Sequence, residues 1–304
     1  MIEKAATCFA DRAWHGTAAV VENVQLARNT WRIRLECPEV ARRTVPGQFV
    51  MVRLADSDDP LLGRPLALYD TYPAANGQPQ GIDLVYLVIG RMTRRLQALT
   101  AGSKVELWGP LGNGFAPHAV DHLLMVAGGI GQTPFPALAK EYLGLRQYGD
   151  PPRTVPRAQK VTLCYGVRSA EYLAGLDDFR SLGVDVRIAT DDGTAGHHGF
   201  VTEVLRDLLD EVGPVAAAAA DTNGEQRAAV RIISCGPEPM MEAVSNLAIE
   251  RNVPCEVSLE TPMACGIGIC FSCVAKIRQA DGSWDYRRTC VEGPVFDATS
   301  IEWD

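Results

Sequence analysis

The chain has 304 residues, of which 47% are hydrophobic, and it carries a formal net charge of −8. This length and composition predict a globular protein of two or three domains, and the negative charge argues against nucleic acid as the main partner. The most apolar stretch, residues 123–130, is too short to span a bilayer, and the residues after Met1 do not resemble a signal peptide. We therefore expect a cytoplasmic protein without a membrane partner.

Residues from about 17 to 108 are expected to form a small antiparallel β-barrel. Short alternating strands separated by turn signals such as Asn76-Gly77 and Ala101-Gly102 are typical of this architecture. One short helix, at about residues 93–99, interrupts the series. The expected strands cover residues 18–26, 31–36, 48–54, 65–69, 82–88 and 104–108.

From about residue 122 onward, strands alternate with helices, which predicts a parallel sheet with helices on both faces. Two stretches, residues 146–159 and 215–229, are interpreted as surface loops inserted without a function. The pair His197-His198 is flanked by glycines, and a polar loop is favoured over a metal or acid–base site. The expected strands cover residues 122–127, 160–165, 184–190 and 230–235, and helices are expected from Pro134 and over residues 200–209 and 239–250.

Four of the nine cysteines fall close together near the C-terminal end. Their C-x4-C-x2-C…C spacing is the plant-type ferredoxin pattern for a 2Fe–2S cluster. Gly266 and Gly268 would let the loop wrap a cluster and direct amide N–H groups toward its sulfurs. The alternatives are a structural zinc site, which usually takes two C-x2–4-C pairs, or uncoordinated thiols. The predicted cluster ligands are Cys265, Cys270, Cys273 and Cys290.

Two segments of the barrel have features of a flavin site. The first, Arg64-Pro65-Leu66-Ala67, begins a strand, where the arginine could pair with a pyrophosphate and the extended backbone could bond the isoalloxazine edge. Taken alone, this segment is more often an ordinary strand entry with a surface arginine.

The second segment places Tyr86-Leu87-Val88 at the end of a strand, and Met92-Thr93 then opens the short helix. A helix N-terminus offers free N–H groups to phosphate, and Thr93 could cap the helix and contact phosphate as well. An ordinary capped helix is the alternative. The two segments together, ahead of a nucleotide-type domain, are a stronger signal than either.

Two further motifs indicate a nicotinamide site in the α/β part. Gly128, Gly129 and Gly131 join its first strand to its first helix, where glycines allow the backbone to approach a pyrophosphate. Cys235 ends a later strand at the carboxyl edge of the sheet, where open α/β folds bind ligands. The alternatives are a tight strand–helix turn and a buried small hydrophobic residue.

The order of barrel, parallel α/β domain and cysteine-rich tail resembles the ferredoxin–NADP reductase superfamily. Within it, the chain is most similar to the electron-transfer subunits of type B dihydroorotate dehydrogenase. The runs that carry this resemblance are Arg64-Pro65-Leu66, Gly109-Pro110-Leu111-Gly112-Asn113-Gly114-Phe115, Ala127-Gly128-Gly129-Ile130-Gly131, Cys235-Gly236-Pro237, Met263–Cys273 and Cys290–Phe296.

This resemblance implies an FAD-binding barrel domain over residues 1–116, an NAD-binding α/β domain over residues 117–254 and a 2Fe–2S domain over residues 255–304. It implies FAD at Arg64–Ala67, at Tyr86–Val88 and at Met92–Thr93, with the cluster on the four cysteines. The chain departs from the family at Ala67, where Ser is common, and at Met92, where Gly is common. The first change removes a hydroxyl contact to the flavin, and the second could alter the phosphate pocket.

The resemblance also implies a function. Electrons would pass from the FMN of a dihydroorotate dehydrogenase catalytic subunit through the 2Fe–2S cluster and FAD to NAD⁺, in de novo pyrimidine biosynthesis. FAD is needed between the cluster and the nicotinamide, because nicotinamide exchanges two electrons at once and the cluster carries one. The expected assembly is a heterotetramer of two subunits of each kind, and this chain has no obvious catalytic residue of its own.

Two other interpretations remain open. The chain could be the reductase subunit of another complex, such as a sulfhydrogenase or a ferredoxin–nicotinamide oxidoreductase, which share this layout. It could also be a zinc-stabilised binding protein without enzymatic activity. NAD and NADP are not distinguished, because Arg168-Ser169 could meet a 2′-phosphate or form an ordinary turn.

Overall fold

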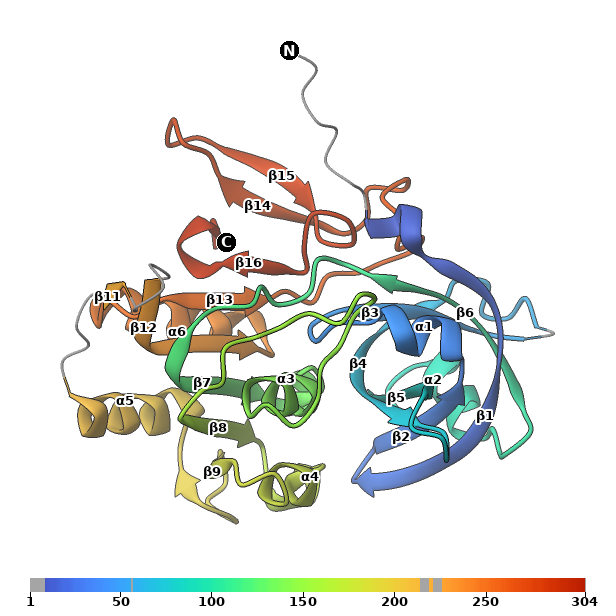
Figure 1. Ribbon diagram of the computed structural model, residues 1–304, viewed down its shortest axis with the longest axis horizontal. Coiled ribbons are helices and arrows are strands. Elements are labelled where there is room, and N and C mark those ends of the chain that lie inside the picture. Colours follow the sequence, from blue (N-terminus) through green and yellow to red (C-terminus); the bar gives the residue numbers. More distant parts are fainter. Residues whose placement is uncertain (1–8, 56, 214–218, 221–225, 304) are drawn as a thin grey trace.

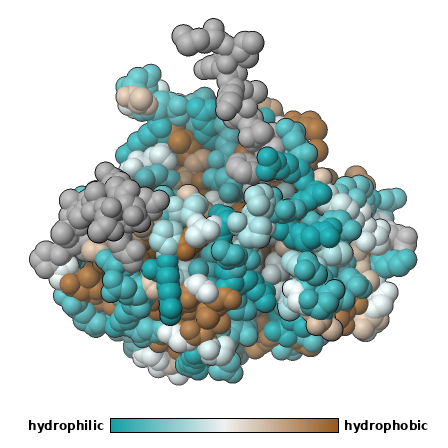
Figure 2. Space-filling view, in the orientation of Figure 1, coloured by the Kyte–Doolittle hydropathy of each residue, from teal (hydrophilic) through white to brown (hydrophobic). Residues whose placement is uncertain are grey.

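The computed structural model describes residues 9–55, 57–213, 219–220 and 226–303. Figure 1 shows a barrel beside a sheet layered with helices, and a small C-terminal hairpin that projects from them. The face drawn in Figure 2 is mostly hydrophilic, with hydrophobic residues in separate smaller groups. Within the described ranges, the helices are all too short or too polar to cross a membrane.

Six strands form the expected closed antiparallel barrel, in the order β1-β2-β5-β4-β3-β6. Alternate residues point inward, so Ile33 and Leu35 of β2 are fully buried. The expected short helix is α2 (Arg91–Gln97), whereas the helix α1 (Pro38–Arg43) was not predicted. The strands are β1 (Trp14–Ala27), β2 (Thr30–Glu36), β3 (Phe49–Leu54), β4 (Arg64–Pro73), β5 (Pro79–Leu87) and β6 (Lys104–Leu111).

The second part is the expected parallel sheet, in the order β10-β9-β8-β7-β12-β13-β16, with β16 added antiparallel to β13. The pair His197–His198 forms the edge strand β10 rather than a loop, and His197 Nε2 lies 2.9 Å from Glu203 Oε2. The strands are β7 (Val120–Gly128), β8 (Lys160–Val167), β9 (Asp185–Thr190), β10 (His197–His198), β11 (Ala219–Ala220), β12 (Gln226–Cys235), β13 (Cys255–Ser258) and β16 (Val295–Asp297).

Helices cover both faces of this sheet, as the sequence predicts. Alternate residues of β7 point to opposite faces of the sheet. Leu124 and Val126 pack with α5 and α6 on one face. Leu123 and Met125 pack with α3 and α4 on the other. A central strand of a parallel sheet must therefore be apolar on both sides. The helices are α3 (Phe135–Tyr142), α4 (Leu176–Arg180), α5 (Val201–Val212) and α6 (Glu238–Glu250).

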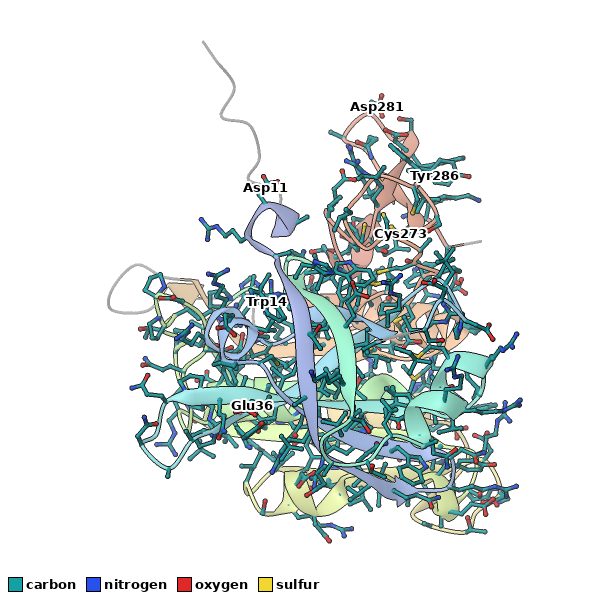
Figure 3. All side chains as sticks on the ribbon, turned by 90° about the vertical axis from the view of Figure 1, so that its right-hand side faces the viewer. Asp11, Trp14, Glu36, Cys273, Asp281 and Tyr286 are labelled. Carbon is teal, nitrogen blue, oxygen red and sulfur yellow. The ribbon has the colours of Figure 1, made fainter. Side chains whose placement is uncertain are left out.

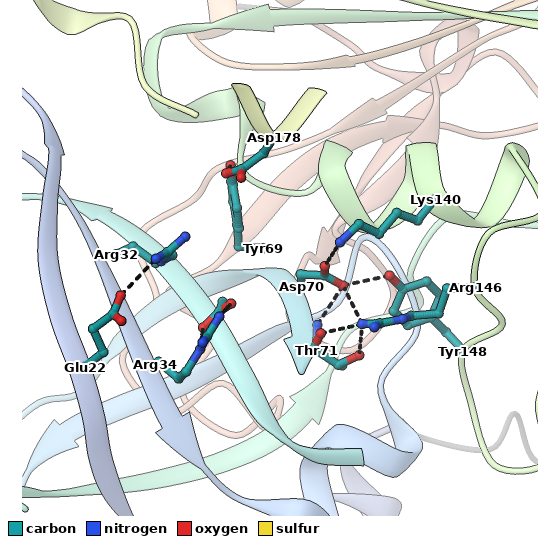
Figure 4. Close-up of polar contacts among 11 residues, drawn as sticks. Glu22, Arg32, Arg34, Tyr69, Asp70, Thr71, Lys140, Arg146, Tyr148 and Asp178 are labelled. Atoms are coloured by element: carbon teal, nitrogen blue, oxygen red, sulfur yellow. Dashed lines mark hydrogen bonds and ion pairs between the residues drawn. The ribbon is translucent and has the colours of Figure 1, made fainter. Parts of the chain in front are cut away.

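A buried carboxylate joins the barrel to the helical layer of the sheet (Figure 4). Asp70 lies on β4, and its side chain forms an ion pair with Lys140 of α3. Arg146 lies 3.3 Å from the same carboxylate, and the hydroxyl of Tyr148 donates to it at 2.7 Å. One barrel side chain therefore holds two separate stretches of the neighbouring domain.

The preceding residue makes a second connection. The hydroxyl of Tyr69 donates a hydrogen bond of 2.5 Å to Asp178 of α4. Tyr69 is itself buried, so its ring is enclosed where the two parts meet. Consecutive residues of one strand thus hold two different helices in place.

The stretch 146–159 is a loop with mostly exposed or partly exposed residues, as predicted, but it also packs against the rest of the protein. Tyr148 is buried against the barrel core, and Arg153 pairs bidentately with the buried Glu141 at 2.8 and 2.7 Å. Its proline and arginine content suggested an exposed loop, but its long side chains reach buried partners. The other expected insertion, residues 215–229, lies largely outside the described residues.

The C-terminal segment leaves the sheet after β13, forms a hairpin of β14 (Val274–Arg278) and β15 (Trp284–Arg288), and returns as β16. Asn113, which follows β6, fixes this return. Its Nδ2 donates to the carbonyl oxygen of Val295 at 2.8 Å, and its Oδ1 accepts from the N–H of Val295 at 3.1 Å. Two of the motif runs identified in the sequence are therefore in direct contact.

Candidate functional site

The four predicted cluster cysteines lie together at the base of the hairpin, beside the barrel, as the position of Cys273 in Figure 3 illustrates. The Sγ atoms of Cys273 and Cys290 are 3.1 Å apart. The thiols of Cys265 and Cys270 interact with each other, and Cys265 also acts electrostatically on Cys290. The four sulfurs therefore form two neighbouring pairs.

The two pairs differ in their surroundings. Cys273 and Cys290 are buried, whereas Cys270 is exposed. Hydrogen bonds with Ser272 lower the pKa of the Cys270 thiol to about 6, whereas burial raises the pKa of Cys290 to about 12. One edge of the cysteine site therefore faces outward and the other is packed inside the protein.

The cysteine loop has the form that a cluster requires. Gly266 and Gly268 have φ angles of +73° and +83°, which glycine adopts without steric cost. The N–H of Ile267 points at the Sγ atom of Cys265, 3.4 Å away. In the part of the chain that the structure describes, no three His, Cys, Asp or Glu side chains are arranged to hold a single metal ion. Two thiol pairs fit the two irons of a 2Fe–2S cluster better than one tetrahedral zinc.

The cysteine loop packs directly against the barrel. The indole Nε1 of Trp108, on β6, donates to the carbonyl oxygen of Cys265 at 2.9 Å. Met51, on β3, lies beneath Gly266, where a Cβ atom would come within 2.5 Å of its Cγ. Because Met51 is paired with Pro65 on the neighbouring strand, the cysteine loop lies one strand away from the first predicted flavin segment.

The first flavin segment occupies the start of β4. Arg64 is exposed, and its guanidinium bonds only backbone carbonyls nearby, those of Leu62 and Gly63 at 3.2 and 3.0 Å, within the described residues. Its charge is therefore open to a ligand. Leu66 is buried in the barrel core, and Ala67 is partly exposed opposite Phe49. Within this segment, the arginine is therefore the side chain most open to solvent.

The second segment is more enclosed. The hydroxyl of Tyr86 donates to Asn23 Oδ1 at 3.0 Å, and burial raises its pKa to about 12. Thr93 Oγ1 accepts hydrogen bonds from the N–H groups of Ile89 and Gly90, both at 3.1 Å, so it caps α2. Met92 packs into the barrel core, which accommodates its bulk away from the surface.

A cavity of about 810 Å³ lies between the barrel and the carboxyl edge of the sheet. Leu87 is the predicted flavin residue that lines it, and Gly128 and Gly129 line it on the sheet side. Gly129 has a φ of +56° and nothing within 4 Å of the position where a Cβ atom would lie. The glycine turn thus presents bare backbone to the cavity, as a dinucleotide pyrophosphate requires.

Gly131 and Cys235 support the cavity from beneath. A Cβ atom on Gly131 would overlap the carbonyl group of Cys235, so only glycine allows this close approach. Cys235 is buried, and burial raises the pKa of its thiol well above the ordinary value. The next two residues, Gly236 and Pro237, are the ones that line the cavity.

The cavity also contains side chains that sequence reasoning did not select. Arg168, considered only for its possible contact with a 2′-phosphate, and Asp191 follow β8 and β9, and Glu260 follows β13. Asn29 and Thr30 contribute from the barrel. These sheet residues share one feature in the sequence: each comes within two residues of the end of a parallel strand, at the edge where such sheets bind ligands.

Solved structures with a similar fold indicate the class of protein. One, described as an NADH-dependent reduced ferredoxin–NADP oxidoreductase studied for flavin-based electron bifurcation, is 27% identical with a TM-score of 0.73, covering 94% of this chain and 90% of that chain. A ferredoxin–NADP⁺ reductase from Neisseria gonorrhoeae shares the fold with a TM-score of 0.56 at 15% identity, over 78% of this chain and 91% of that one. Together with the site, this defines an oxidoreductase of the ferredoxin reductase type that uses FAD, NAD and a 2Fe–2S cluster.

Sequence comparisons identify the family. Residues 260–302 match the iron–sulfur cluster binding domain of dihydroorotate dehydrogenase B, and residues 125–246 match an oxidoreductase NAD-binding domain. Proteins named dihydroorotate dehydrogenase B (NAD(+)), electron transfer subunit, are 33% identical in Desulforamulus reducens, over 94% of this chain and 98% of the relative, and 31% identical in Fusobacterium nucleatum, over 93% and 96%. The chain belongs to this family of electron transfer subunits.

Proposed function

We propose that this chain carries electrons from the FMN of a dihydroorotate dehydrogenase catalytic subunit to NAD⁺, as a step of de novo pyrimidine biosynthesis. The observation that carries the proposal is the arrangement of the four cysteines, whose loop packs on Met51, one strand away from the start of β4. The proposed complex contains two copies of this chain and two of the catalytic subunit.

We assign the cofactor contacts as follows. Cys265 and Cys270 would hold one iron, and Cys273 and Cys290 the other, because these are the pairs that lie together. Arg64 and the backbone through Ala67 would hold the flavin, with further contacts from Tyr86–Val88 and Met92–Thr93. When bound, FAD links two-electron exchange with nicotinamide to one-electron exchange with the cluster.

The partner would dock beside the exposed cysteine. Ile269 and Phe271 flank Cys270 and are 73% and 63% exposed, so apolar side chains surround the outward edge of the cysteine site. Exposed apolar residues grouped around one feature are typical of a protein interface. Docking here would bring the partner's cofactor next to the cluster, while the buried pair faces the barrel.

The nicotinamide would bind in the cavity, with its pyrophosphate at Gly128 and Gly129. Gly131 would keep the turn against β12, and Cys235 would support the cavity wall from below.

We also propose the three-domain division at residues 116 and 254. The sheet crosses the second boundary, since β13 and β16 both belong to it.

A second candidate is the reductase subunit of another complex, such as a sulfhydrogenase or a ferredoxin–nicotinamide oxidoreductase. It is favoured by the 27% identical structure, whose description names a ferredoxin–NADP oxidoreductase. The partner distinguishes the two candidates. A purified complex that contains an FMN-binding subunit and oxidises dihydroorotate supports the first, and one that contains a hydrogenase or a large iron–sulfur flavoprotein supports the second.

The cofactor assignment is tested on protein purified without oxygen. We expect FAD and about two irons per chain, an EPR signal of a reduced 2Fe–2S cluster, and reduction of a dye by NADH. Cys273→Ser should abolish the EPR signal, whereas Cys164→Ala, at a buried cysteine outside the cluster loop, should retain it. Iron and EPR signal that persist undiminished in Cys273→Ser would refute the ligand assignment.

A further inference from the structure

An unpaired carboxylate stands in the cavity between the barrel and the sheet. Glu260 lines this cavity, two residues after the end of β13 and five residues before Cys265. Within the described part of the chain, its carboxylate forms no hydrogen bond or ion pair. Water reaches the side chain, yet desolvation by the surrounding protein raises the pKa of the carboxyl. A charged group left without a partner in such a cavity is available to a ligand.

The sheet order identifies which end of a dinucleotide would meet Glu260. The strand β7, with the glycine turn at its end, lies at the centre of the cavity-lining strands. On one side of it, Arg168 and Asp191 follow β8 and β9; on the other side, Pro237 and Glu260 follow β12 and β13 by two residues each. With its pyrophosphate on the glycine turn, a dinucleotide must therefore extend one end toward Arg168 and Asp191 and the other toward Glu260.

The nicotinamide belongs at the Glu260 end, because the cysteine loop and the proposed flavin strand lie there. Met51 contacts Gly266 of the cysteine loop and is paired with Pro65 of the flavin strand. Glu260 begins the segment that leads into the same loop. A nicotinamide that stacks on a flavin held at β4 thus comes to the side of the cavity that carries this carboxylate.

We propose that Glu260 contacts the nicotinamide ring and favours the oxidised dinucleotide over the reduced one. The ring of NAD⁺ carries a positive charge, which a nearby carboxylate attracts, whereas the ring of NADH is neutral. The ribose and pyrophosphate groups are the same in both forms, so the preference arises at the ring alone. This inference rests on the proposed nicotinamide function. Under it, Glu260 strengthens the binding of the acceptor NAD⁺ and favours the dissociation of the product NADH.

The test compares the affinities for the two forms in the complete holoprotein. NAD⁺ is titrated into oxidised protein and NADH into dithionite-reduced protein by calorimetry, so that neither can react. We expect Glu260→Gln to weaken NAD⁺ binding about fivefold and NADH binding less than about twofold, the upper end of the size expected for one partly exposed charge pair. Glu260→Asp, which keeps the charge, should stay within about threefold of the wild type for NAD⁺.

The control is Asp191→Asn, at the opposite end of the cavity, which should shift both affinities by the same factor. A ratio of the two dissociation constants that is unchanged in Glu260→Gln would overturn the inference. If that variant loses its flavin or its cluster, titrations of wild-type protein at rising salt decide instead: the affinity for NAD⁺ must fall more than that for NADH. Wild-type protein that binds neither form would refute the proposed nicotinamide function itself.

Discussion

Trp108 donates a hydrogen bond from its indole Nε1 to the carbonyl oxygen of Cys265, over 2.9 Å. The same ring packs on Gly63, where a Cβ atom would come within 2.9 Å of it. Gly63 directly precedes Arg64, so one side chain touches both the cysteine loop and the start of the proposed flavin strand. This contact holds the loop at a fixed position on the barrel.

Trp108→Phe keeps most of the ring but removes this hydrogen bond. We expect the free energy of unfolding to fall by about 1 kcal/mol, and the EPR spectrum of the reduced cluster to broaden as the loop loses its anchor. Urea unfolding and EPR measure the two effects. Trp284→Phe, at an exposed position of the hairpin, is the matched control and should change neither. Identical spectra and stabilities for both variants would contradict this role.

Asp70→Asn removes the negative charge that Lys140 and Arg146 share (Figure 4). Because the carboxylate is buried and its partners come from the other domain, we expect a loss of about 2–3 kcal/mol in the free energy of unfolding. Chemical denaturation measures it. Asp177→Asn, whose carboxylate is fully exposed beside Arg180, should change stability by less than about 0.5 kcal/mol. A loss as small as that of the control would count against the network.

Alanine substitutions at Gly131 and Gly129 should have different effects, the first mainly on stability and the second mainly on NADH binding. Gly131→Ala forces a methyl group into the carbonyl of Cys235, so we expect a loss of stability of about 3 kcal/mol or more, or insoluble protein. Gly129→Ala points into open space and costs only about 1 kcal/mol of backbone strain, but its methyl group enters the cavity. Thermal unfolding and NADH titration separate the two. Normal NADH affinity in Gly129→Ala would argue against dinucleotide binding at this turn.

His122 predicts a dependence of stability on pH. Burial lowers its pKa to about 4, helped by Lys160 and Arg187 and opposed by Asp185, while its Nε2 lies 2.8 Å from Thr162 Oγ1. An unfolded histidine titrates near pH 6.5. Between about pH 4 and 6.5 the unfolded chain therefore binds more protons at this residue, and the folded state loses stability as the pH falls.

Allowing for its partial exposure, His122 accounts for about 1 kcal/mol of the stability lost between pH 7 and pH 5. His122→Gln should reduce the difference between the urea midpoints at these two pH values accordingly. A difference equal to that of the wild type would show that the histidine is not held in its neutral form.

Much of this architecture could be predicted because its signals are local. The barrel strands alternate with a period of two, and β7 is apolar on both faces, so periodicity and turn residues were sufficient. The cysteine spacing likewise indicated a cluster, because the proposed ligands Cys265, Cys270 and Cys273 lie within one loop.

Contacts between distant segments could not be predicted in this way. Glu260 is an ordinary acidic residue in the sequence, and only the sheet order brings it to the cavity that Arg168 lines. Tyr148 lies in a stretch predicted as a surface loop from its proline and arginine content, and its buried contact could not be foreseen because its partner, Asp70, lies 78 residues away. Neither position carries a local signal of its role.

The path of the C-terminal segment has a consequence for how this protein can be divided. The chain forms β13 of the sheet, leaves it to form the cysteine loop and hairpin, and returns to the same sheet as β16. Two hydrogen bonds between Asn113 and Val295 hold β16 in place. Removal of everything after Leu259 would strip β13 of its outer neighbour and open a backbone edge to self-association. The cysteine loop and hairpin are thus connected at both ends to strands of the nucleotide-binding sheet. They could not be removed or exchanged as an independent domain without disrupting that sheet.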